Sequence, residues 1–503
     1  TMSAATSIST TAPPSDMPSR RWAILAVLGI AQLMVVLDAT IVNIALPSAQ
    51  GALGFNNDGR QWIVTAYSLA FGSLLLLGGR LADLIGRKTT FVIGIVGFAC
   101  ASAIGGAATS FAMLVTARTI QGAFAALLAP TALSLLTTTF TEGKDRARAF
   151  GVFGAIAGSG AAIGLMLGGV LTEYLDWRWT LYVNVVIAFF ALAGVILFVP
   201  RSIPVARPRL DVLGVLLAAG GLFCIVFGFA NAETHPWSNW MVWAFLAAGV
   251  VLLTAFVFWQ SRAPRPLLPL TVPADRNRGA ALSTVFVASA GMFGVFLFLT
   301  YYLQQTLGYS PVQNGLAFLP MVGVLMATAQ LSTIVLVPRI GSKLVVPVGL
   351  LLAAIGMAWL TRLGLHSTYA AHVLPPLVVV GLGLGLSRPA AMSRSTLGVR
   401  MSDPGVASAT MNTTQQIGGA ISTALLNSLA NAAAATYVAA HLTDPLVQAN
   451  AAMRSYETAF WWSAGFFAVG AVIAALLFRR KGVGGSVVPA PATVAARLLA
   501  AST

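Results

Sequence analysis

The sequence predicts an all-α polytopic membrane protein with fourteen transmembrane helices, and three observations support this fold class. The chain of 503 residues is 57% hydrophobic and only 9% charged, whereas soluble proteins carry about 25% charged residues. Its apolar residues gather in runs of roughly the 20 residues that a helix needs to cross a bilayer. Lys and Arg residues concentrate on one side of these runs when successive runs alternate in direction. A soluble globular enzyme is excluded.

The fourteen apolar runs are the expected membrane spans. Residues 1–21 are rich in Ser, Thr and Pro and are expected to form a disordered cytoplasmic N-terminus. Residues 479–503 are expected to form a cytoplasmic tail. The spans lie near residues 22–46, 61–79, 90–108, 111–137, 147–170, 179–199, 212–232, 240–259, 280–304, 314–338, 344–364, 373–397, 407–431 and 457–478.

The distribution of basic residues predicts the orientation. With the N-terminus in the cytoplasm, 24 of the 29 Lys and Arg residues fall in cytoplasmic segments and 4 fall in outer loops. Such an excess marks the cytoplasmic side. Both termini are therefore expected in the cytoplasm, with the protein in the cell (inner) membrane. The net charge of +15 belongs to many short loops and not to one patch, which argues against a nucleic-acid partner.

Two segments of the chain are similar to each other, which predicts a repeated architecture. Residues 122–134 read GAFAALLAPTALS and residues 381–393 read GLGLGLSRPAAMS, so glycine, leucine, proline, alanine and serine recur in register. Gly86 is echoed by Gly341 at a similar offset. Internal repeats are typical of secondary transporters, whose binding site lies between the repeats.

The repeat divides the chain into expected domains. An N-terminal six-helix bundle is expected over residues 22–199 and a C-terminal six-helix bundle over residues 280–478. Residues 200–279 are then a two-helix insert with its linkers. Together the bundles and the insert account for the fourteen expected spans.

One acidic side chain lies well inside a predicted span. Asp38 is in the first span, whereas the other 13 of the 14 acidic residues fall in loops, tails or span ends. Arg118 is an intramembrane cation in the fourth span. Ionisable groups are costly in lipid and usually functional there, so both residues are expected to take part in proton coupling. The alternative is an ion pair with a structural role only.

The loop after the second span combines charges with glycines. It reads GRLADLIGRK and contains Gly79, Asp83, Gly86, Arg87 and Lys88. A loop that merely fixes orientation would explain the two terminal basic residues. Glycines also permit a tight turn, and a carboxylate is stabilised at the N-terminal end of a helix. The five residues are therefore expected to latch the cytoplasmic faces of the two halves together.

Several residues of the spans are candidates for the wall of a substrate cavity. The alternative for the polar ones is hydrogen bonding between helices, and for the apolar ones ordinary packing or lipid contact. Arg388, in the cytoplasmic third of the twelfth span, would either disfavour cationic substrates or extend to the lipid headgroups. The candidates are Asn43, Gln121, Phe293, Phe296, Met321, Arg388, Asn412 and Gln416.

The loop GRLADLIGRK closely resembles the signature loop of the major facilitator superfamily. The segment RTIQG at 118–122 resembles a second motif of that superfamily. The segments LDATIVNIALP at 37–47 and DWRW at 176–179 are similar to the 14-span drug:proton antiporter subfamily. The resemblance covers most of the chain. It implies two six-helix bundles of the major facilitator type plus two extra transmembrane helices, and export of drugs in exchange for protons.

The fifth span carries a series of glycines, for which two explanations stand. One is ordinary small-residue packing of membrane helices. The other is implied by the resemblance: an antiporter motif that forms a tight contact with a neighbouring helix. Leu165 stands where the family usually has proline, so this helix is expected to be straighter. The glycines are Gly154, Gly158, Gly160, Gly164, Gly168 and Gly169.

Several absences narrow the expected chemistry. The chain has no Gly-x4-Gly-Lys-Ser/Thr phosphate loop, so it is not an ATP-driven pump by itself. The two cysteines lie inside apolar runs and the four histidines lie in or near outer loops. No disulfide framework, metal site or cofactor is expected, and the protein is not expected to be an enzyme.

The expected function is secondary active export of amphipathic, often cationic, drugs or dyes. Its energy source would be the proton gradient, and its partners would be small molecules, protons and the lipid bilayer around a monomer. One alternative is a proton-coupled exporter of a lipid or a secreted metabolite. A more distant alternative is a channel or a membrane enzyme, although a single intramembrane acid does not make a selectivity filter.

Overall fold

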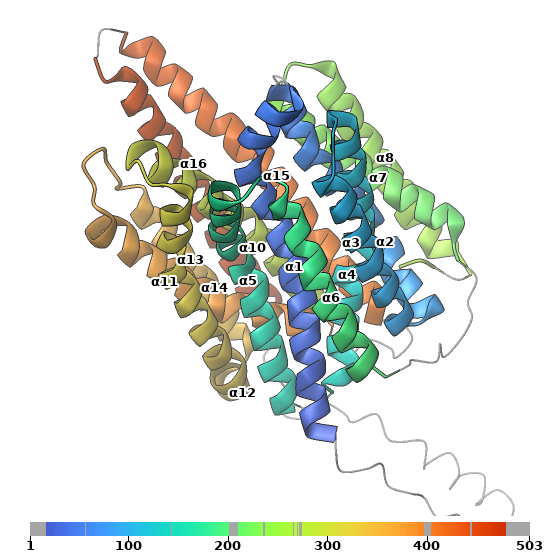
Figure 1. Cartoon of the computed structure of the whole chain (residues 1–503). Helices are drawn as coiled ribbons and strands as arrows, with labels where there is room; N and C mark the ends of the chain where they lie inside the picture. The colour runs from blue at the N-terminus through green and yellow to red at the C-terminus, as the bar shows by residue number, and fades with distance from the viewer. Residues whose placement is uncertain are drawn as a thin grey trace, which may run out of the picture.

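The structure is a computed structural model of the whole chain. It describes residues 17–55, 57–141, 143–200, 210–234, 237–264, 266–268, 270, 274–396, 404–442 and 445–478. All regular elements within this described part are helices, which confirms the all-α class. Figure 1 shows them as one bundle of long helices.

The helices follow the predicted order of an N-terminal half, an insert and a C-terminal half. The N-terminal half consists of α1 (Met17–Leu53), α2 (Asn57–Ile85), α3 (Arg87–Gly106), α4 (Phe111–Thr139), α5 (Gly143–Tyr174) and α6 (Trp179–Phe198). The insert consists of α7 (Val212–Thr234) and α8 (Trp240–Arg262). The C-terminal half consists of α10 (Arg276–Tyr301), η1 (Tyr302–Thr306), α11 (Pro311–Leu331), η2 (Ser332–Leu336), α12 (Val337–Ile340), α13 (Ser342–Leu360), η3 (Tyr369–Val373), α14 (Leu374–Ser395), α15 (Pro404–Ala440) and α16 (Val447–Leu477).

Each predicted span coincides with one helix or one continuous helical run. Within the described residues, twelve helices are long and apolar enough to cross a membrane, so the chain is a multi-pass membrane protein. The helices α5 and α15, rich in Gly, Ala, Ser and Thr, are not among these twelve. The total of fourteen spans therefore stays a prediction.

Helices contact one another both within each half and between the halves. In the N-terminal half α2 packs on α4 and α1 packs on α5; in the C-terminal half α11 packs on α14 and α13 packs on α14. The halves meet along two lines, where α5 packs on α11 and α2 packs on α15. The insert helices α7 and α8 lie side by side at one edge of the bundle (Figure 1), and α7 contacts both α2 and α15.

The internal repeat is visible in backbone geometry. Gly86 precedes α3 with φ 96° and Gly341 precedes α13 with φ 83°, both in the left-handed region that favours glycine. A Cβ on Gly122 of α4 would lie 2.3 Å from the Tyr67 carbonyl oxygen of α2. A Cβ on Gly381 of α14 would lie 2.6 Å from the Met321 carbonyl oxygen of α11. Equivalent helices thus cross at equivalent glycines.

Three π-helical turns distinguish the halves. In the described residues η1, η2 and η3 all lie in the C-terminal half, on the runs that include α10, α11 and α14. Insertion of a π-turn shifts the facing of the following residues, and hydropathy does not reveal it. We call the end of the bundle that carries the turn between α2 and α3 the inner end, and the opposite end the outer end.

Candidate functional site: a buried acid network and the inner seam

Asp38 and Arg118 form an ion pair inside the N-terminal half. Arg118 Nη1 lies 2.6 Å from Asp38 Oδ2, and neither residue exceeds 1% exposure. Gln121, one turn further along α4, accepts a hydrogen bond from Arg118 at 2.7 Å and donates one to Asp38 Oδ1 at 2.8 Å. The carboxylate on α1 is therefore held by two side chains of α4.

The sequence reasoning missed three other members of this network. Asn184 of α6 donates to Asp38 Oδ1 at 2.7 Å and to the Ser102 hydroxyl of α3 at 3.1 Å. The Tyr67 ring of α2 lies 4.3 Å from the Arg118 guanidinium carbon. An isolated Asn within the very apolar span of α6 was the available signal, because an unpaired amide is costly in lipid.

The network satisfies the buried carboxylate of Asp38. Asp38 receives donors from three side chains, so its ionised form is paired although it is fully buried. A buried ion pair has a large desolvation penalty and is weak evidence for stability alone. Separation of Arg118 from Asp38 would leave a buried carboxylate without its cation.

The glycine series of α5 packs on α1 beside this network. A Cβ on Gly164 would lie 2.1 Å from Thr40 Oγ1 and 3.0 Å from the Leu37 carbonyl oxygen, immediately next to Asp38. Gly160 and Gly168 similarly approach other residues of α1, whereas Gly154 approaches Pro389 of α14. Gly169 is buried, and the surroundings of Gly158 lie outside the described part. The helix α5 runs unbroken from Gly143 to Tyr174.

Asp83 joins the two halves at the inner end. We call the contacts between the halves at this end the inner seam. Its Oδ1 accepts a hydrogen bond from the Gly405 amide at 3.2 Å and its Oδ2 accepts one from the Val406 amide at 3.3 Å. These amides are at the N-terminal end of α15, where a carboxylate is favoured. Arg87 lies 3.7 Å from Asp83. The close approach of α2 and α15 requires glycine, because a Cβ on Gly79 would lie 2.5 Å from the Gly405 carbonyl oxygen.

Lys88, another basic residue of this loop, contacts α6. Lys88 Nζ donates to the carbonyl oxygens of Ile196 at 3.1 Å and Val199 at 2.6 Å, at the C-terminal end of α6. A cation there is favoured by the helix dipole. Lys88 therefore ties α3 to α6 within the N-terminal half, and within the described residues no hydrogen bond of Lys88 joins the two halves.

Arg146 forms a second connection between the halves, which the sequence reasoning did not identify. Its Nη2 donates to Thr396 Oγ1 at 2.9 Å and to the Ser393 carbonyl oxygen at 3.4 Å, both at the C-terminal end of α14. Its Nη1 donates to the Phe140 carbonyl oxygen at 3.3 Å. Burial lowers the pKa of Arg146 to about 10, so the group stays charged at neutral pH.

The proposed cavity residues are distributed between the network, the seam and the core. Gln121 belongs to the acid network. Met321 has no exposure and packs in the hydrophobic core of the C-terminal half, and Phe296 packs against that core with its ring 5.1 Å from the Phe318 ring. In this conformation Met321 is a core residue and not a cavity wall, because α11 crosses α14 at its position.

Two of the remaining cavity candidates, Asn412 and Gln416, are half-buried on α15. Asn412 donates to the Ser408 carbonyl oxygen of its own helix at 2.9 Å. The side chains of Asn43 on α1 and Phe293 on α10 lie outside the described part.

Arg388 does not extend to the lipid headgroups. Its exposure is only 6%, and its Nη1 lies 2.7 Å from Met292 Sδ of α10. The headgroup alternative is therefore wrong for this conformation: the side chain points into the bundle, toward α10, and not along α14 to the membrane surface.

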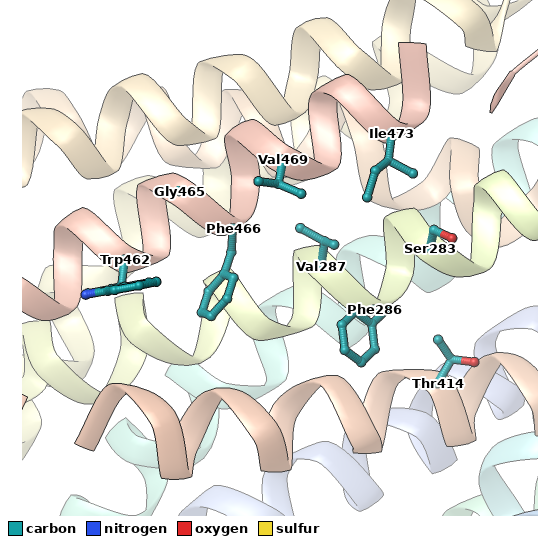
Figure 2. A pocket seen from close by; sticks show the side chains of 9 residues that line it. All are labelled: Ser283, Phe286, Val287, Thr414, Trp462, Gly465, Phe466, Val469 and Ile473. Carbon is teal, nitrogen blue, oxygen red and sulfur yellow. The ribbon is translucent and has the colours of Figure 1, made fainter. Parts of the chain in front are cut away.

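A distinct apolar groove lies on the flank of the C-terminal half. It has a volume of about 640 Å³ and is lined by residues of α10, α15 and α16, among them Phe286, Thr414, Trp462, Phe466 and Val469 (Figure 2). Trp462 and Val469 are 46% and 56% exposed, so the groove opens to the surroundings of the bundle. It contains none of the predicted cavity residues.

Two acids at span ends are further possible sites of proton coupling. Asp211 at the start of α7 accepts hydrogen bonds from Gly214, Trp259 and Gln260. Burial alone would raise the pKa of Asp211, but these hydrogen bonds outweigh it and hold the pKa below its usual range. Glu457 pairs with Arg454 at 2.6 Å on an exposed surface. Both are anchored surface anions and not isolated acids within the bundle.

Repeated helical halves are typical of secondary transporters. Among the described residues, no cluster of His, Cys, Asp and Glu is suited to hold a metal ion. A family model described as Major Facilitator Superfamily matches residues 28–423. The chain belongs to this family and is a membrane transporter.

Several relatives are named as antibiotic resistance or export proteins. The puromycin resistance protein pur8 of Streptomyces alboniger is 48% identical over 461 residues, covering 91% of each chain. The cephamycin export protein CmcT of Amycolatopsis lactamdurans is 40% identical and covers 79% of this chain and 82% of its own. A solved structure of the proton:xylose symporter XylE matches with TM-score 0.61 at 15% identity, over 92% of this chain and 95% of that one, which shows the fold alone.

Proposed function

We propose that this transporter exports amphipathic small molecules, drugs or dyes among them, in exchange for protons. It would act as a monomer without a cofactor, in the cell (inner) membrane, with both termini in the cytoplasm. The observation that carries the proposal is the Asp38 network. A fully buried carboxylate, balanced by one movable cation and two amides, is the arrangement that a proton-driven exchange needs.

The exchange would work through the competition between protonation and pairing. When Arg118 contacts Asp38, the ionised carboxylate is favoured and the proton leaves. When α1 and α4 separate, burial favours the neutral acid and a proton is taken up. The glycines of α5 support this scheme, because their close contact with α1 beside Asp38 would transmit movements of the halves to the ion pair.

The names of the relatives support the direction and the class of substrate. One relative is a resistance protein for puromycin and another is an export protein for cephamycin. These names also favour a second candidate, which is export of a secreted metabolite. Resistance of cells to many unrelated dyes would favour the drug exporter, whereas transport of one compound would favour the metabolite exporter.

The experiment is dye efflux from proteoliposomes under an imposed pH gradient, with and without an uncoupler. Wild-type efflux should saturate with dye concentration, run uphill and stop with the uncoupler. Asp38→Asn removes the titratable group and should reduce uphill efflux at least about a hundredfold, a barrier change of about 2.7 kcal/mol. Glu173→Gln, at an exposed acid of α5, is the matched control and should keep wild-type efflux.

Asp38→Asn leaves Arg118 unpaired, so folding must be separated from coupling. The double variant Asp38→Asn/Arg118→Gln removes both charges and keeps side chains of similar size. It should fold and still exchange dye down its gradient, without response to pH. Uphill pumping by either variant would show that proton coupling resides elsewhere, and efflux that never saturates would indicate a channel.

A further inference from the structure

Arg388 is a buried cation that has no anionic partner among the residues that the structure describes. Its exposure is 6%, and its hydrogen-bond partner in the described part of the chain is the thioether of Met292, a weak acceptor. No described carboxylate lies within ion-pair distance of it. Arg118, in contrast, donates hydrogen bonds to the carboxylate of Asp38 and to the amide oxygen of Gln121. A buried charge normally has an ion partner, so the missing anion needs an explanation.

The location of Arg388 is the interface between the halves. The next residue, Pro389, faces Gly154 of α5, whose added Cβ would lie 3.0 Å from it. Ala391 and Met392 pack into the hydrophobic cluster of the N-terminal half, whereas Met292 packs into that of the C-terminal half. Arg388 therefore sits where both clusters meet, beneath the inner seam that Asp83 and Arg146 close.

Buried hydroxyl groups without partners occur on neighbouring helices. Ser289 of α10 lies one turn before Met292, on the same helix face, and is 9% exposed. Thr131 and Ser134 of α4 have no exposure, and Thr413 of α15 is 8% exposed. None of the four hydroxyl oxygens has a hydrogen-bond partner in the described part of the chain. Such groups are donors available to an anion, and Ser289 lies on the same face of α10 as Met292, the hydrogen-bond partner of Arg388.

We propose that Arg388 binds an acidic group, of the carboxylate type, on the transported molecule. This deepens the function proposed above and rests on it. When the inner seam opens, the guanidinium becomes accessible from the inner end and pairs with the carboxylate of an amphipathic substrate. Its planar fork suits that group better than a point charge does. The apolar remainder of the substrate meets the surrounding Met and Ala side chains.

The proposal also explains why the site would select against cations. Asp38 is the acid deep in the described spans, and Arg118, Gln121 and Asn184 already occupy its oxygens. A cationic drug would find this carboxylate engaged and would meet the positive charge of Arg388 first. Among the described residues, the buried acid Asp38 is thus paired with Arg118, whereas the buried cation Arg388 has no carboxylate partner, which favours anionic over cationic substrates.

The test uses dansyl-leucine, an amphipathic carboxylate, and its uncharged methyl ester. Binding to the purified transporter is measured by dansyl fluorescence, and efflux from proteoliposomes gives KM and kcat for each dye. Arg388→Gln should weaken binding of the carboxylate at least about tenfold, equivalent to about 1.4 kcal/mol, and change that of the ester less than about twofold. Arg388→Lys should be intermediate. Arg394→Gln, on the same helix with Ser342 as partner, should leave both dyes unchanged.

The outcomes separate this proposal from the proposed function. Equal losses for both dyes, or no loss for either, in Arg388→Gln would overturn the role of Arg388 while leaving proton-driven export intact. If wild-type protein moves neither dye uphill, the proposed function fails for these substrates. The fluorescence titration needs no gradient and still decides whether Arg388 prefers the carboxylate over the ester.

Discussion

The two halves of the transporter share a backbone plan but carry different charges. Gly86 and Gly341 turn the chain in the same way, and Gly122 and Gly381 mark the same helix crossing. The N-terminal half holds an acid–base network that is internally neutral. In the described part of the C-terminal half, Arg388 has no acidic partner. The repeat therefore sets how helices pack, whereas the chemistry differs from one half to the other.

The connections at the inner seam show the same asymmetry. Asp83 of α2 and Arg146 of α5 both belong to the N-terminal half. Asp83 contacts the N-terminal end of α15 and Arg146 contacts the C-terminal end of α14. The C-terminal half contributes helix ends, with backbone groups and one Thr hydroxyl. Charged side chains of one half thus meet helix dipoles of the other, with the sign that each dipole favours.

The largest expected effect is a difference in stability between two arginine variants. Removal of Arg118 should destabilise the protein strongly, whereas removal of Arg388 should not. Arg118→Gln leaves Asp38 as an uncompensated buried charge, which should cost about 3–5 kcal/mol. Arg388→Gln removes a cation that has no anion to leave behind, so its cost should be within about 1 kcal/mol of zero or favourable. Thermal unfolding of the purified protein in detergent measures both.

The double variant Asp38→Asn/Arg118→Gln is the control for the first half of this comparison. It should regain most of the stability lost in Arg118→Gln, because neither charge is left alone. A loss in Arg388→Gln as large as that in Arg118→Gln would mean that Arg388 has an anionic partner within the protein, and the contrast between the halves would disappear.

The sequence predicted the spans and the residues of the acid pair, because both depend on composition. Length and apolarity identify a membrane helix, and an acid in lipid is conspicuous wherever it points. It also singled out Asp83, since glycines and an acid at that spacing suit a turn beside a helix end, and the role of Asp83 as a latch stays a prediction. The total of fourteen spans and the domain boundaries remain predictions.

Sequence reasoning missed the features that depend on which helix faces meet. Asn184 and Ser102 enter the network because α3 and α6 turn these residues toward Asp38. Arg146 was counted as one basic residue of a cytoplasmic loop, yet it reaches α14. The burial of Arg388 likewise follows from the orientation of α14 toward α10. The mean hydropathy of a span does not show which face of the helix points toward which neighbour.

Substitutions of uncharged polar side chains test the same comparison between the halves, with an expected effect of intermediate size. Asn184→Ala removes a donor to the Asp38 carboxylate at 2.7 Å, and hydrogen bonds to charged groups contribute about 1.5–3 kcal/mol. Ser289→Ala removes a buried hydroxyl without a partner, so it should be neutral or slightly stabilising. Unfolding in detergent should show the first variant destabilised and the second not. Equal destabilisation of the two would indicate that Ser289 is paired within the protein.

The smallest expected effect concerns the two connections at the inner seam. Asp83→Ala and Arg146→Gln each remove one charge–dipole contact, of about 1 kcal/mol, which changes the ratio of closed to open states roughly fivefold. Met392, 4% exposed at the seam, reports opening when replaced by cysteine in a chain with Cys100→Ala and Cys224→Ala. Maleimide labelling from the inner end should accelerate roughly fivefold in either variant.

Arg339→Gln, at an exposed residue of the inner end, is the matched control. Both contacts stabilise one closed state, so the double variant should label faster than each single one. Unchanged labelling in Arg146→Gln alone would show that Asp83 is sufficient, and that α14 is held to α5 by packing at Gly154 and not by charge.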